Sequence, residues 1–595
     1  FIKNKDLKMS KYSVQQQPIE TLLSWIKSGE IAIPEIQRPF VWNASKVRDL
    51  LDSLHKGYPV GYIITWRNPD IRLKDGTLSA GKRVLIDGQQ RITALTAAVV
   101  GQAVLNKEYK QNKIKIAYNP QAKDHESAFE VCNNAIERNP IWIDDIAPIL
   151  NGDTPISKIR RQYLEKNPTV DEDKIEEKIN ELQAIKNRQI GIIELNPDLE
   201  IDTVTEIFIR INQKGVVLSN ADFVMSKIAA DQQFGGNTLR KMIDYFCHLL
   251  NDSGFAKHIE SNDTQFFQSP DFAKIKWIAQ YTDNLYHPNY IDVLRVAYTY
   301  AFQRGRFSDL VALLSGRDFE KRSNTEEIAQ QSYEKLRTGL MAFFNETHYK
   351  RFLLLIRSAG FIHANLLNSQ NSLNIAYAIY LHLCDLKMSE HEIQHWVKKW
   401  FVMSLLTGRY SGSSESVIER DIKQIQEKGI QEYFQLIELA ELNSGFWEHT
   451  LVRNLDSSSN VNAAYLCYLA AQCQNQEKAF LSGSVKVSDL FETRGDEHHF
   501  FPKAYLEKHG YKKSEYNQIA NFVYTEQQIN IRLQDKPPFE YLQQIQQDIE
   551  QGKQQYTSIP SLVEWRENLA VHCIPENWQA FRQENYADFC KNAEN

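Results

Sequence analysis

The chain has 595 residues, too many for one hydrophobic core, and its length predicts three to five domains at about 100–200 residues each. Hydrophobic residues make up 42% and charged residues 24%, a balance that excludes wholesale disorder. The net charge of -6 excludes a uniformly basic DNA-coating protein, but a nucleic-acid enzyme needs a positive field only along its groove. Since no segment is apolar enough to cross a bilayer and no signal-peptide core is present, we expect a cytoplasmic protein without membrane contact.

Seven cysteines are scattered through the chain, and none forms a CxxC pair. This usage is typical of a reducing compartment and excludes a cysteine-rich zinc domain. The chain also has no repeat of fixed period, which excludes a repeat array.

Helix and strand signals alternate over residues 1–228 and predict a compact α+β domain. Apolar residues at helical spacing predict the helices, the second of which has Ser45 as its expected N-cap. The expected helices are 21–28, 46–56, 89–101, 158–187 and 204–211, and the expected strands or extended segments are 31–33, 60–66, 83–86 and 190–195.

Residues 229–455 carry apolar side chains at 3.6-residue spacing almost throughout, which predicts an all-α middle domain. We interpret the loop Gly408–Ser413 within it as a polar connector between helices. The polar run Asp456–Asn460 indicates a boundary, and residues 456–595 mix strand and helix signals again. The predicted fold class is therefore α+β multidomain.

Gly76–Arg83 matches the GxxxxGK pattern of a phosphate-binding loop. However, Arg83 stands where such loops carry the Ser or Thr that binds magnesium, and the segment runs into a strand instead of a helix. We therefore interpret it as a hairpin turn.

His391, Glu392 and His395 form an HExxH sequence, the pattern that binds zinc on one helix face in metalloproteases. Ser389 is the expected N-cap, which places these residues in an exposed first turn. Two polar histidines at a helix start are the favoured interpretation, and a zinc protease stays the alternative.

Two N-terminal motifs, IPEIQRPFVW at 33–42 and DGQQR at 87–91, indicate a ligand site. Gly88 permits a tight strand-to-helix turn and close approach of a ligand to the backbone. Arg38 and Arg91 could bind a phosphate through two hydrogen bonds each, and Asp87 could bind a metal or a sugar hydroxyl. A capped turn stabilised by an Asp–Arg pair fits the same residues, so the pattern alone leaves both interpretations open.

The C-terminal segment Glu497–Lys503 reads EHHFFPK and predicts a strand over 498–501 that Pro502 ends. A second strand is expected over 522–525, followed by a helix or turn that carries Asn530. Such a ββα hairpin would bring His498, His499 and Asn530 together around one divalent ion. The alternative interpretation is that the histidine pair lies in a surface loop without a catalytic role.

These residue types suit phosphodiester hydrolysis. A neutral imidazole takes a proton from the attacking water near physiological pH. A hard cation neutralises charge on the phosphorane and the leaving oxygen, and a carboxamide oxygen is a suitable ligand for it.

Both ends of the chain resemble one family, the single-chain GmrSD-type, modification-dependent (type IV) restriction endonucleases, which include the BREX-associated BrxU proteins. The motifs at 33–42 and 87–91, with FIRIN at 208–212, resemble the ParB/sulfiredoxin-like nucleotide-binding domain of that family. HHFFPKAYL at 498–506 and the asparagines 521 and 530 resemble its HNH (His-Me finger) nuclease domain.

The resemblance assigns roles to individual residues. It implies that His499 is the general base, that His498 and Asn530 bind the metal, and that Asn521 positions the base or the scissile phosphate. His498 stands where many HNH enzymes have Asp, which should weaken Mg²⁺ and favour Mn²⁺ or softer first-row ions. The nucleotide or modified-DNA site is expected to contain Gln37, Arg38, Asp87, Gly88, Gln89, Gln90, Arg91 and Asn212.

The resemblance thus implies a nucleotide-regulated, metal-dependent endonuclease with NTPase activity that defends against phages. The expected substrate is double-stranded DNA with hydroxymethylated or glucosylated cytosine or a phosphorothioate backbone. We expect a homodimer, because a single-site nuclease cuts two strands most simply as two copies. The main alternative is a non-cleaving, NTP-gated DNA sensor.

Overall fold

The computed structural model describes most of the chain, in two compact units. One unit comprises Phe1–Gln280 and Val311–Tyr333, and the other comprises Tyr281–Leu310 and Glu334–Asn595. The boundaries expected at residues 228 and 455 lie inside these units, so the three-part division stays a prediction. The described residues are 11–28, 30–32, 42–67, 83–105, 111–123, 126–197, 199, 207, 220–231, 233–319, 325–412, 414–493 and 496–594.

The first unit contains a mixed five-stranded sheet in the order β1-β9-β3-β4-β2. β3 pairs antiparallel with β4 and parallel with β9, whereas β2 pairs parallel with β4. The strands other than β1 are rich in Ile, Leu and Val and contribute Ile31, Ile63, Leu85, Ile190 and Ile192 to the core that they share with the helices. Their bounds are Tyr12–Pro18 (β1), Ile31–Ala32 (β2), Tyr62–Trp66 (β3), Arg83–Asp87 (β4) and Gln189–Leu195 (β9).

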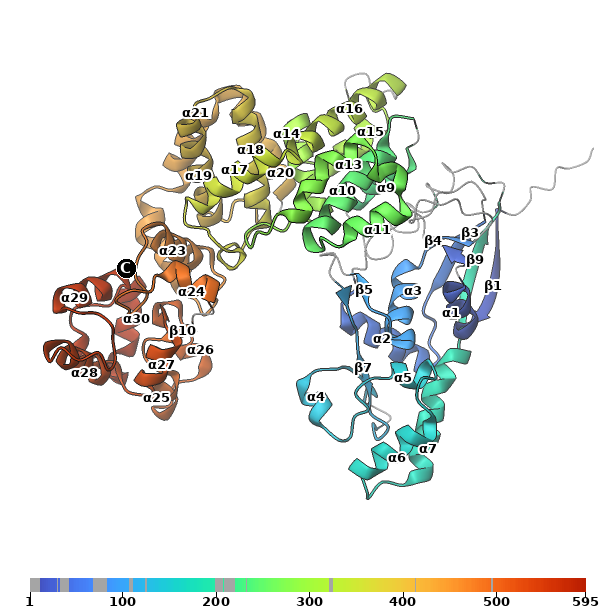
Figure 1. Ribbon diagram of the computed structural model, residues 1–595, viewed down its shortest axis with the longest axis horizontal. Helices are drawn as coiled ribbons and strands as arrows, with labels where there is room; N and C mark the ends of the chain where they lie inside the picture. Colours follow the sequence, from blue (N-terminus) through green and yellow to red (C-terminus); the bar gives the residue numbers. More distant parts are fainter. Residues whose placement is uncertain are drawn as a thin grey trace, which may run out of the picture. The chain divides into compact units, whose positions relative to one another are not determined.

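Helices α2 and α3 lie side by side along this sheet (Figure 1). The helices expected at 21–28, 46–56 and 89–101 are confirmed. The mostly helical stretch expected at 158–187 consists of two helices and a 3-10 turn, and 204–211 falls almost wholly outside the described residues. The other elements up to β9 are α1 (Ile19–Lys27), α2 (Ala44–His55), α3 (Gln89–Leu95) with a π-helical turn (Thr96–Val100), β5 (Val104–Leu105), β6 (Gln111–Asn112), β7 (Ile116–Tyr118), β8 (Phe129–Val131), α4 (Asn134–Arg138), α5 (Ala147–Leu150), α6 (Ile156–Lys166), α7 (Glu172–Gln183) and a 3-10 turn (Ala184–Asn187).

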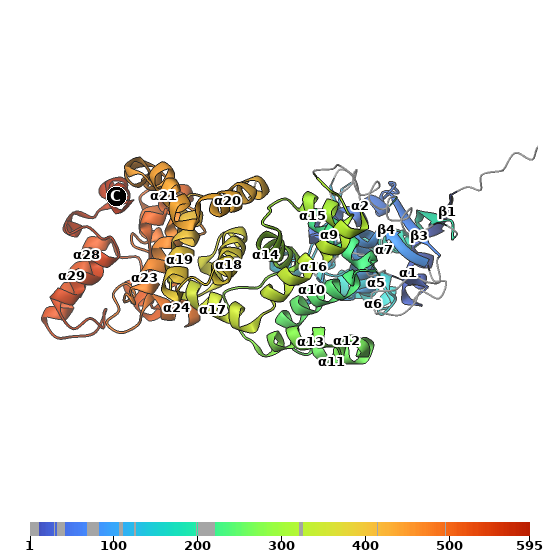
Figure 2. The same cartoon turned by 90° about the horizontal axis from the view of Figure 1, so that it is seen from above.

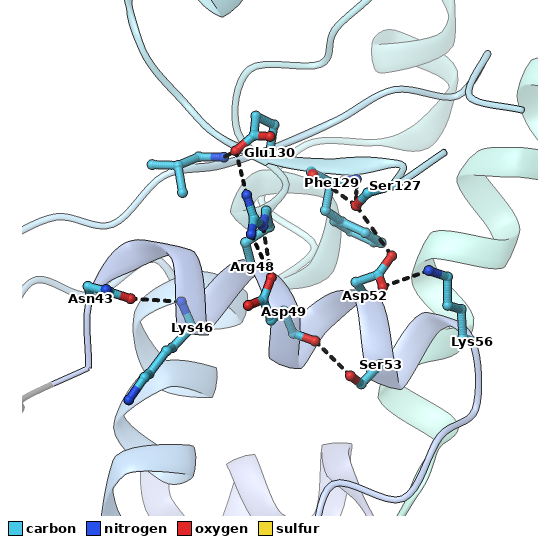
Figure 3. A network of polar contacts seen from close by, with 11 residues as sticks. Asn43, Lys46, Arg48, Asp49, Asp52, Ser53, Lys56, Ser127, Phe129 and Glu130 are labelled. Carbon is cyan, nitrogen blue, oxygen red and sulfur yellow. Dashed lines mark hydrogen bonds and ion pairs between the residues drawn. The ribbon is translucent and has the colours of Figure 1, made fainter. Parts of the chain in front are cut away.

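Helix α2 is capped by Asn43, so the prediction of Ser45 as its N-cap is wrong. The side chain of Asn43 accepts a hydrogen bond of 3.0 Å from the backbone amide of Lys46, and this geometry starts the helix before Ser45 (Figure 3). Arg48 on the same helix pairs with Glu130 of β8 at 3.0 Å (Figure 3). The helix is therefore fixed at its start and tied to a neighbouring strand.

All described elements between residues 220 and 475 are helices, which confirms the helical middle region. In the second unit, α18 lies between α14 and α19 (Figure 2). No helix formed by the described residues is long and apolar enough to span a membrane. The helices are α9 (Asn220–Ala230), α10 (Gly236–Asn251), α11 (Phe255–Asn262), α12 (Thr264–Phe267), α13 (Pro270–Ile275) with a 3-10 turn (Lys276–Gln280), α14 (Tyr290–Phe302), α15 (Phe307–Leu314), α16 (Glu326–Phe343), α17 (Glu346–Arg357), a 3-10 turn (Ala364–Leu366), α18 (Gln370–Asp385), α19 (Glu390–Leu406), α20 (Ser414–Lys428), α21 (Ile430–Glu441), a π-helical turn (Phe446–Thr450), α22 (Leu451–Leu455) and α23 (Ala463–Gln474).

The last part of the chain packs helices around one antiparallel hairpin and an aromatic core. With the mixed sheet of the first unit, this arrangement confirms an α+β protein with several structural parts. The ParB-like and HNH assignments stay predictions. The elements are α24 (Val487–Thr493), β10 (Asp496–His499), α25 (Lys503–Lys508), α26 (Lys513–Tyr516), a 3-10 turn (Ile519–Asn521), β11 (Phe522–Thr525), α27 (Gln527–Leu533), α28 (Pro538–Glu550), α29 (Leu562–Val571), two 3-10 turns (Trp578–Ala580 and Gln583–Asn585) and α30 (Tyr586–Glu594).

Candidate active site

The two candidate histidines end strand β10, which pairs with β11 so that His498 lies opposite Val523 and His499 opposite Phe522. The strand runs from Asp496 to His499, two residues earlier than the expected 498–501. Phe500 and Phe501 have left the strand, and both side chains are fully buried in the aromatic core. The second strand and the helix that carries Asn530 lie as the sequence predicts.

His498 is packed against helix α27 and is only 5% exposed. Burial lowers its pKa to about 4, although a hydrogen bond with the Asn530 side chain acts in the opposite direction. The imidazole is therefore neutral at physiological pH. Its Nε2 is buried and has no well-formed hydrogen bond to any described residue. The structure thus brings His498 and Asn530 together. It leaves Nε2 of His498 without a hydrogen-bond partner among the described residues, whether or not this nitrogen carries the proton.

His499 follows His498 in the strand, so its side chain leaves the opposite face. Its Nε2 lies 3.0 Å from the side-chain oxygen of Asn517, an atom that only accepts, so Nε2–H donates and Nδ1 is the basic nitrogen. The ring meets Phe522 edge to face at 5.2 Å. Burial lowers the pKa of His499, the hydrogen bond to Asn517 raises it, and the charge of Lys503 lowers it.

Asn521 is fully buried and binds the backbone that follows the base. Its side-chain oxygen accepts from the amide of Phe501 at 2.7 Å, and its Nδ2 donates to the carbonyls of Phe501 at 3.2 Å and Tyr516 at 3.1 Å. Because the whole carboxamide is used in these bonds, Asn521 fixes the turn after His499. Of the two roles expected for it, the geometry favours positioning the base over contacting a phosphate.

An open hollow of about 470 Å³ lies beside His499. Its lining includes Asn517, the hydrogen-bond partner of the candidate base, which sequence analysis missed. The sequence signal was weak, because an asparagine in a loop 18 residues away has no spacing rule that joins it to the histidine. The lining residues are Ser458, Lys512, Lys513, Ser514 and Asn517.

The N-terminal motif DGQQR forms the turn from β4 into α3. Gly88 has φ 98°, and a Cβ there would lie 2.5 Å from the side chain of Ile63, so this position requires glycine. Arg91 lies 3.8 Å from the carboxylate of Asp87 and donates to the backbone oxygen of Tyr62 at 3.0 Å. The turn therefore contains the Asp–Arg pair, with both side chains about one-quarter exposed.

The glutamines of this motif are buried. The Gln90 side-chain oxygen accepts from the amide of Trp42 at 3.3 Å, while the Gln89 side-chain oxygen has no hydrogen-bond partner among the described residues. Ala32, the last residue of β2, lies opposite Val84 of β4, the strand that leads into this turn. Three further candidates, Gln37, Arg38 and Asn212, lie outside the described residues.

The HExxH motif starts a helix, and the Gly76–Arg83 segment is described only at its last residue. His391 and His395 are exposed, and the Glu392 carboxylate accepts from the backbone amide of Ser389 at 3.0 Å in a capping box. Arg83 begins strand β4, as a hairpin requires, while 76–82 lie outside the described residues. No group of three His, Cys, Asp or Glu side chains suited to a metal occurs in the described part of the chain.

Comparison with known proteins finds a similarity in the N-terminal region, which contains the DGQQR turn. Residues 19–229 match the N-terminal domain of the GmrSD restriction endonucleases. This match supports a GmrSD-type restriction endonuclease. Such a family implies DNA as a partner and a role in phage defence. The match includes the turn Asp87–Arg91 and ends before the β10–β11 hairpin.

A second similarity extends over most of the chain. The uncharacterized protein MJ0686 of Methanocaldococcus jannaschii is 21% identical to it, over 88% of this chain and 87% of that protein. The two proteins therefore share a distant resemblance over most of their lengths.

Proposed function

We propose that this chain is a metal-dependent endonuclease of the HNH type whose catalytic site is the β10–β11 hairpin with α27. The observation that carries the proposal is the buried, neutral imidazole of His498, which has a free Nε2 beside the carboxamide of Asn530. A buried imidazole nitrogen without a protein partner can be satisfied by a bound metal ion, and Asn530 offers a second ligand beside it.

The residues present fit a divalent ion. His498 and Asn530 would hold it through an imidazole nitrogen and a carboxamide oxygen, and the neutral state of His498 is the one that binds metals. A bound divalent ion would offset negative charge on the phosphorane and the leaving oxygen. Because neither ligand is charged, we expect Mn²⁺ or a softer first-row ion to bind more tightly than Mg²⁺.

His499 would act as the general base. Its Nε2–H is held by Asn517, so Nδ1 is free to accept a proton from water. Its lowered pKa keeps the ring deprotonated at physiological pH. Asn521 holds the turn just after the base through three hydrogen bonds and so limits movement of His499.

The N-terminal turn would bind and sense a nucleoside triphosphate (NTP). Gly88 forms the tight turn that starts α3, and the Gln89 side-chain oxygen is buried without a described partner. Gln37, Arg38, Asp87, Gln90, Arg91 and Asn212 complete the proposed site. NTP binding or hydrolysis there would regulate cleavage of modified double-stranded phage DNA, and two copies of the chain would cut the two strands.

The test is cleavage of phage DNA with and without hydroxymethylated or glucosylated cytosine, and of phosphorothioate DNA. Each substrate is incubated with Mg²⁺, Mn²⁺, Co²⁺ or Ni²⁺, with and without each NTP. His499→Ala should lower the cleavage rate by about 10²–10⁴-fold, the usual contribution of a general base. The matched control is His509→Ala, an exposed histidine in the same part of the chain.

Cleavage by His499→Ala at the parent rate would refute the catalytic assignment. Absence of strand scission under every metal, together with DNA binding that responds to NTP, would favour the non-cleaving sensor instead.

A further inference from the structure

The hollow beside His499 has one wall formed by Ser458 and another formed by the residues around α26. The Ser458 wall is held by a backbone hydrogen bond within the chain, in which the amide of Ile519 donates to the carbonyl of Ser457 at 2.8 Å. Asn460 in the same stretch bonds the side chain of Glu497 on β10. The residues 457–460 are therefore held against the hairpin that carries the candidate base.

The lining of this hollow suits an anion. It contains two ammonium groups, two hydroxyls and a carboxamide, and no carboxylate. Other lysines of the C-terminal region are paired with carboxylates, since Lys508 pairs with Asp535 and Lys478 pairs with Glu564 at 3.2 Å. Within the described part of the chain, Lys512 and Lys513 have no such partner. Two unpaired lysines beside hydroxyl donors are the groups that bind backbone phosphates.

Asn517 joins this hollow to the base. Its oxygen accepts from His499, so the NH₂ group of the same carboxamide is left to donate into the hollow that it lines. A phosphate bound there would contact the side chain that orients His499. DNA backbone binding and base orientation would then depend on one residue.

We infer that the hollow of Ser458, Lys512, Lys513, Ser514 and Asn517 binds a backbone phosphate of the DNA next to the one that is cut. The inference rests on the proposed nuclease function. It adds the side of His499 from which the DNA strand would enter the active site. Lys512 and Lys513 supply the charge, while Asn517 is a positioning residue that acts through His499.

The experiment measures DNA binding by the full chain in EDTA, so that no cleavage occurs. Fluorescence anisotropy with a labelled duplex gives the affinity at several salt concentrations for the parent and for Lys512→Ala/Lys513→Ala. Loss of two phosphate contacts should weaken binding about ten-fold and reduce the slope of log affinity against log salt by about 1.8. The matched control is Lys423→Ala/Lys553→Ala, which removes two exposed lysines elsewhere on the second unit.

An NTP carries the same phosphate chemistry, so binding of a fluorescent NTP is measured in parallel. Unchanged affinity and slope in the Lys512/Lys513 variant, or a loss of NTP binding alone, would overturn the inference. The failure is distinguishable from failure of the nuclease proposal, because the latter is decided by metal-dependent cleavage and by His499→Ala. A parent chain that does not bind duplex DNA at any salt concentration would refute both.

Discussion

His498 and His572 are two histidines of the second unit with nearly the same burial but different partners. Each is 5% exposed, and burial lowers the pKa of each to about 4. The ring of His572 is saturated, with Nε2 at 3.0 Å from the backbone oxygen of Lys478 and Nδ1 at 3.4 Å from the side chain of Gln472. The Nε2 of His498 has no such bond.

This difference separates a structural histidine from a candidate ligand. The same desolvation acts on both rings, so the pKa alone does not distinguish them. A buried polar atom that the protein leaves without a partner costs about 1–3 kcal/mol, and a bound ion would remove that cost. The absence of a partner for Nε2, together with the neighbouring Asn530, therefore supports our proposal that His498 is a metal ligand better than the burial of the ring does.

The largest expected effect is on stabilisation by metal. A divalent ion at 100 times its dissociation constant should stabilise the parent by about 2.7 kcal/mol and raise its melting temperature. His498→Ala removes the imidazole ligand, so the same Mn²⁺ concentration should produce little increase. Calorimetric melting with and without Mn²⁺ measures the difference.

His572→Ala is the control for that experiment, because it removes a ring of equal burial whose nitrogens are already occupied. Its melting temperature should rise with Mn²⁺ as much as that of the parent. If Mn²⁺ raised the melting temperatures of the His498 and His572 variants equally, the assignment of His498 as a metal ligand would be wrong.

A smaller effect is expected on stability without metal. His572→Ala removes a buried ring together with its hydrogen bonds to the Lys478 backbone oxygen and the Gln472 side chain, and should destabilise the fold by about 1–3 kcal/mol. His498→Ala removes a ring whose Nε2 has no well-formed hydrogen bond to any described residue and whose contact with a protein group is the one to Asn530, so its cost should be lower. Urea unfolding in EDTA compares the two variants, and a greater loss for His498→Ala would contradict the assignment of His572 as the structural residue.

Much of this site follows from the sequence, but the partners of the histidines do not. The spacing of apolar residues predicts β11 and the helix that carries Asn530, because both depend on local periodicity. Phe500 and Phe501 extend that apolar pattern, so the sequence places the first strand two residues too late. Their side chains instead enter the aromatic core, which is a tertiary effect.

The loop Gly408–Ser413 shows the same limit in the helical region. We interpreted it as a polar connector, but Arg409 is buried and bonds both carboxylate oxygens of Asp421 at 2.7 Å. Tyr410 donates to the same carboxylate at 3.0 Å. Asp421 lies 12 residues after Arg409 on helix α20, and no local sequence pattern links the two residues. From the sequence alone, a loop that contains a buried ion pair therefore looks the same as a polar connector.

The smallest expected effect concerns the pH at which cleavage begins. The positive charge of Lys503 lowers the pKa of His499, so Lys503→Met should raise that pKa. A general base must be deprotonated, and activity is lost as the pH falls through its pKa. The acidic limb of the rate profile should therefore move to higher pH, as measured by cleavage rates at saturating metal across the pH range.

Asn517→Ala should move the same limb in the opposite direction, because the hydrogen bond that it removes raises the pKa of His499. Its maximal rate should also fall, since the ring loses its orienting partner. Lys553→Met, which removes an exposed lysine elsewhere in the second unit, should leave the limb unchanged. If Lys503→Met and Asn517→Ala shift the limb in the same direction, the rate does not report on His499, and the general base must be sought in another residue.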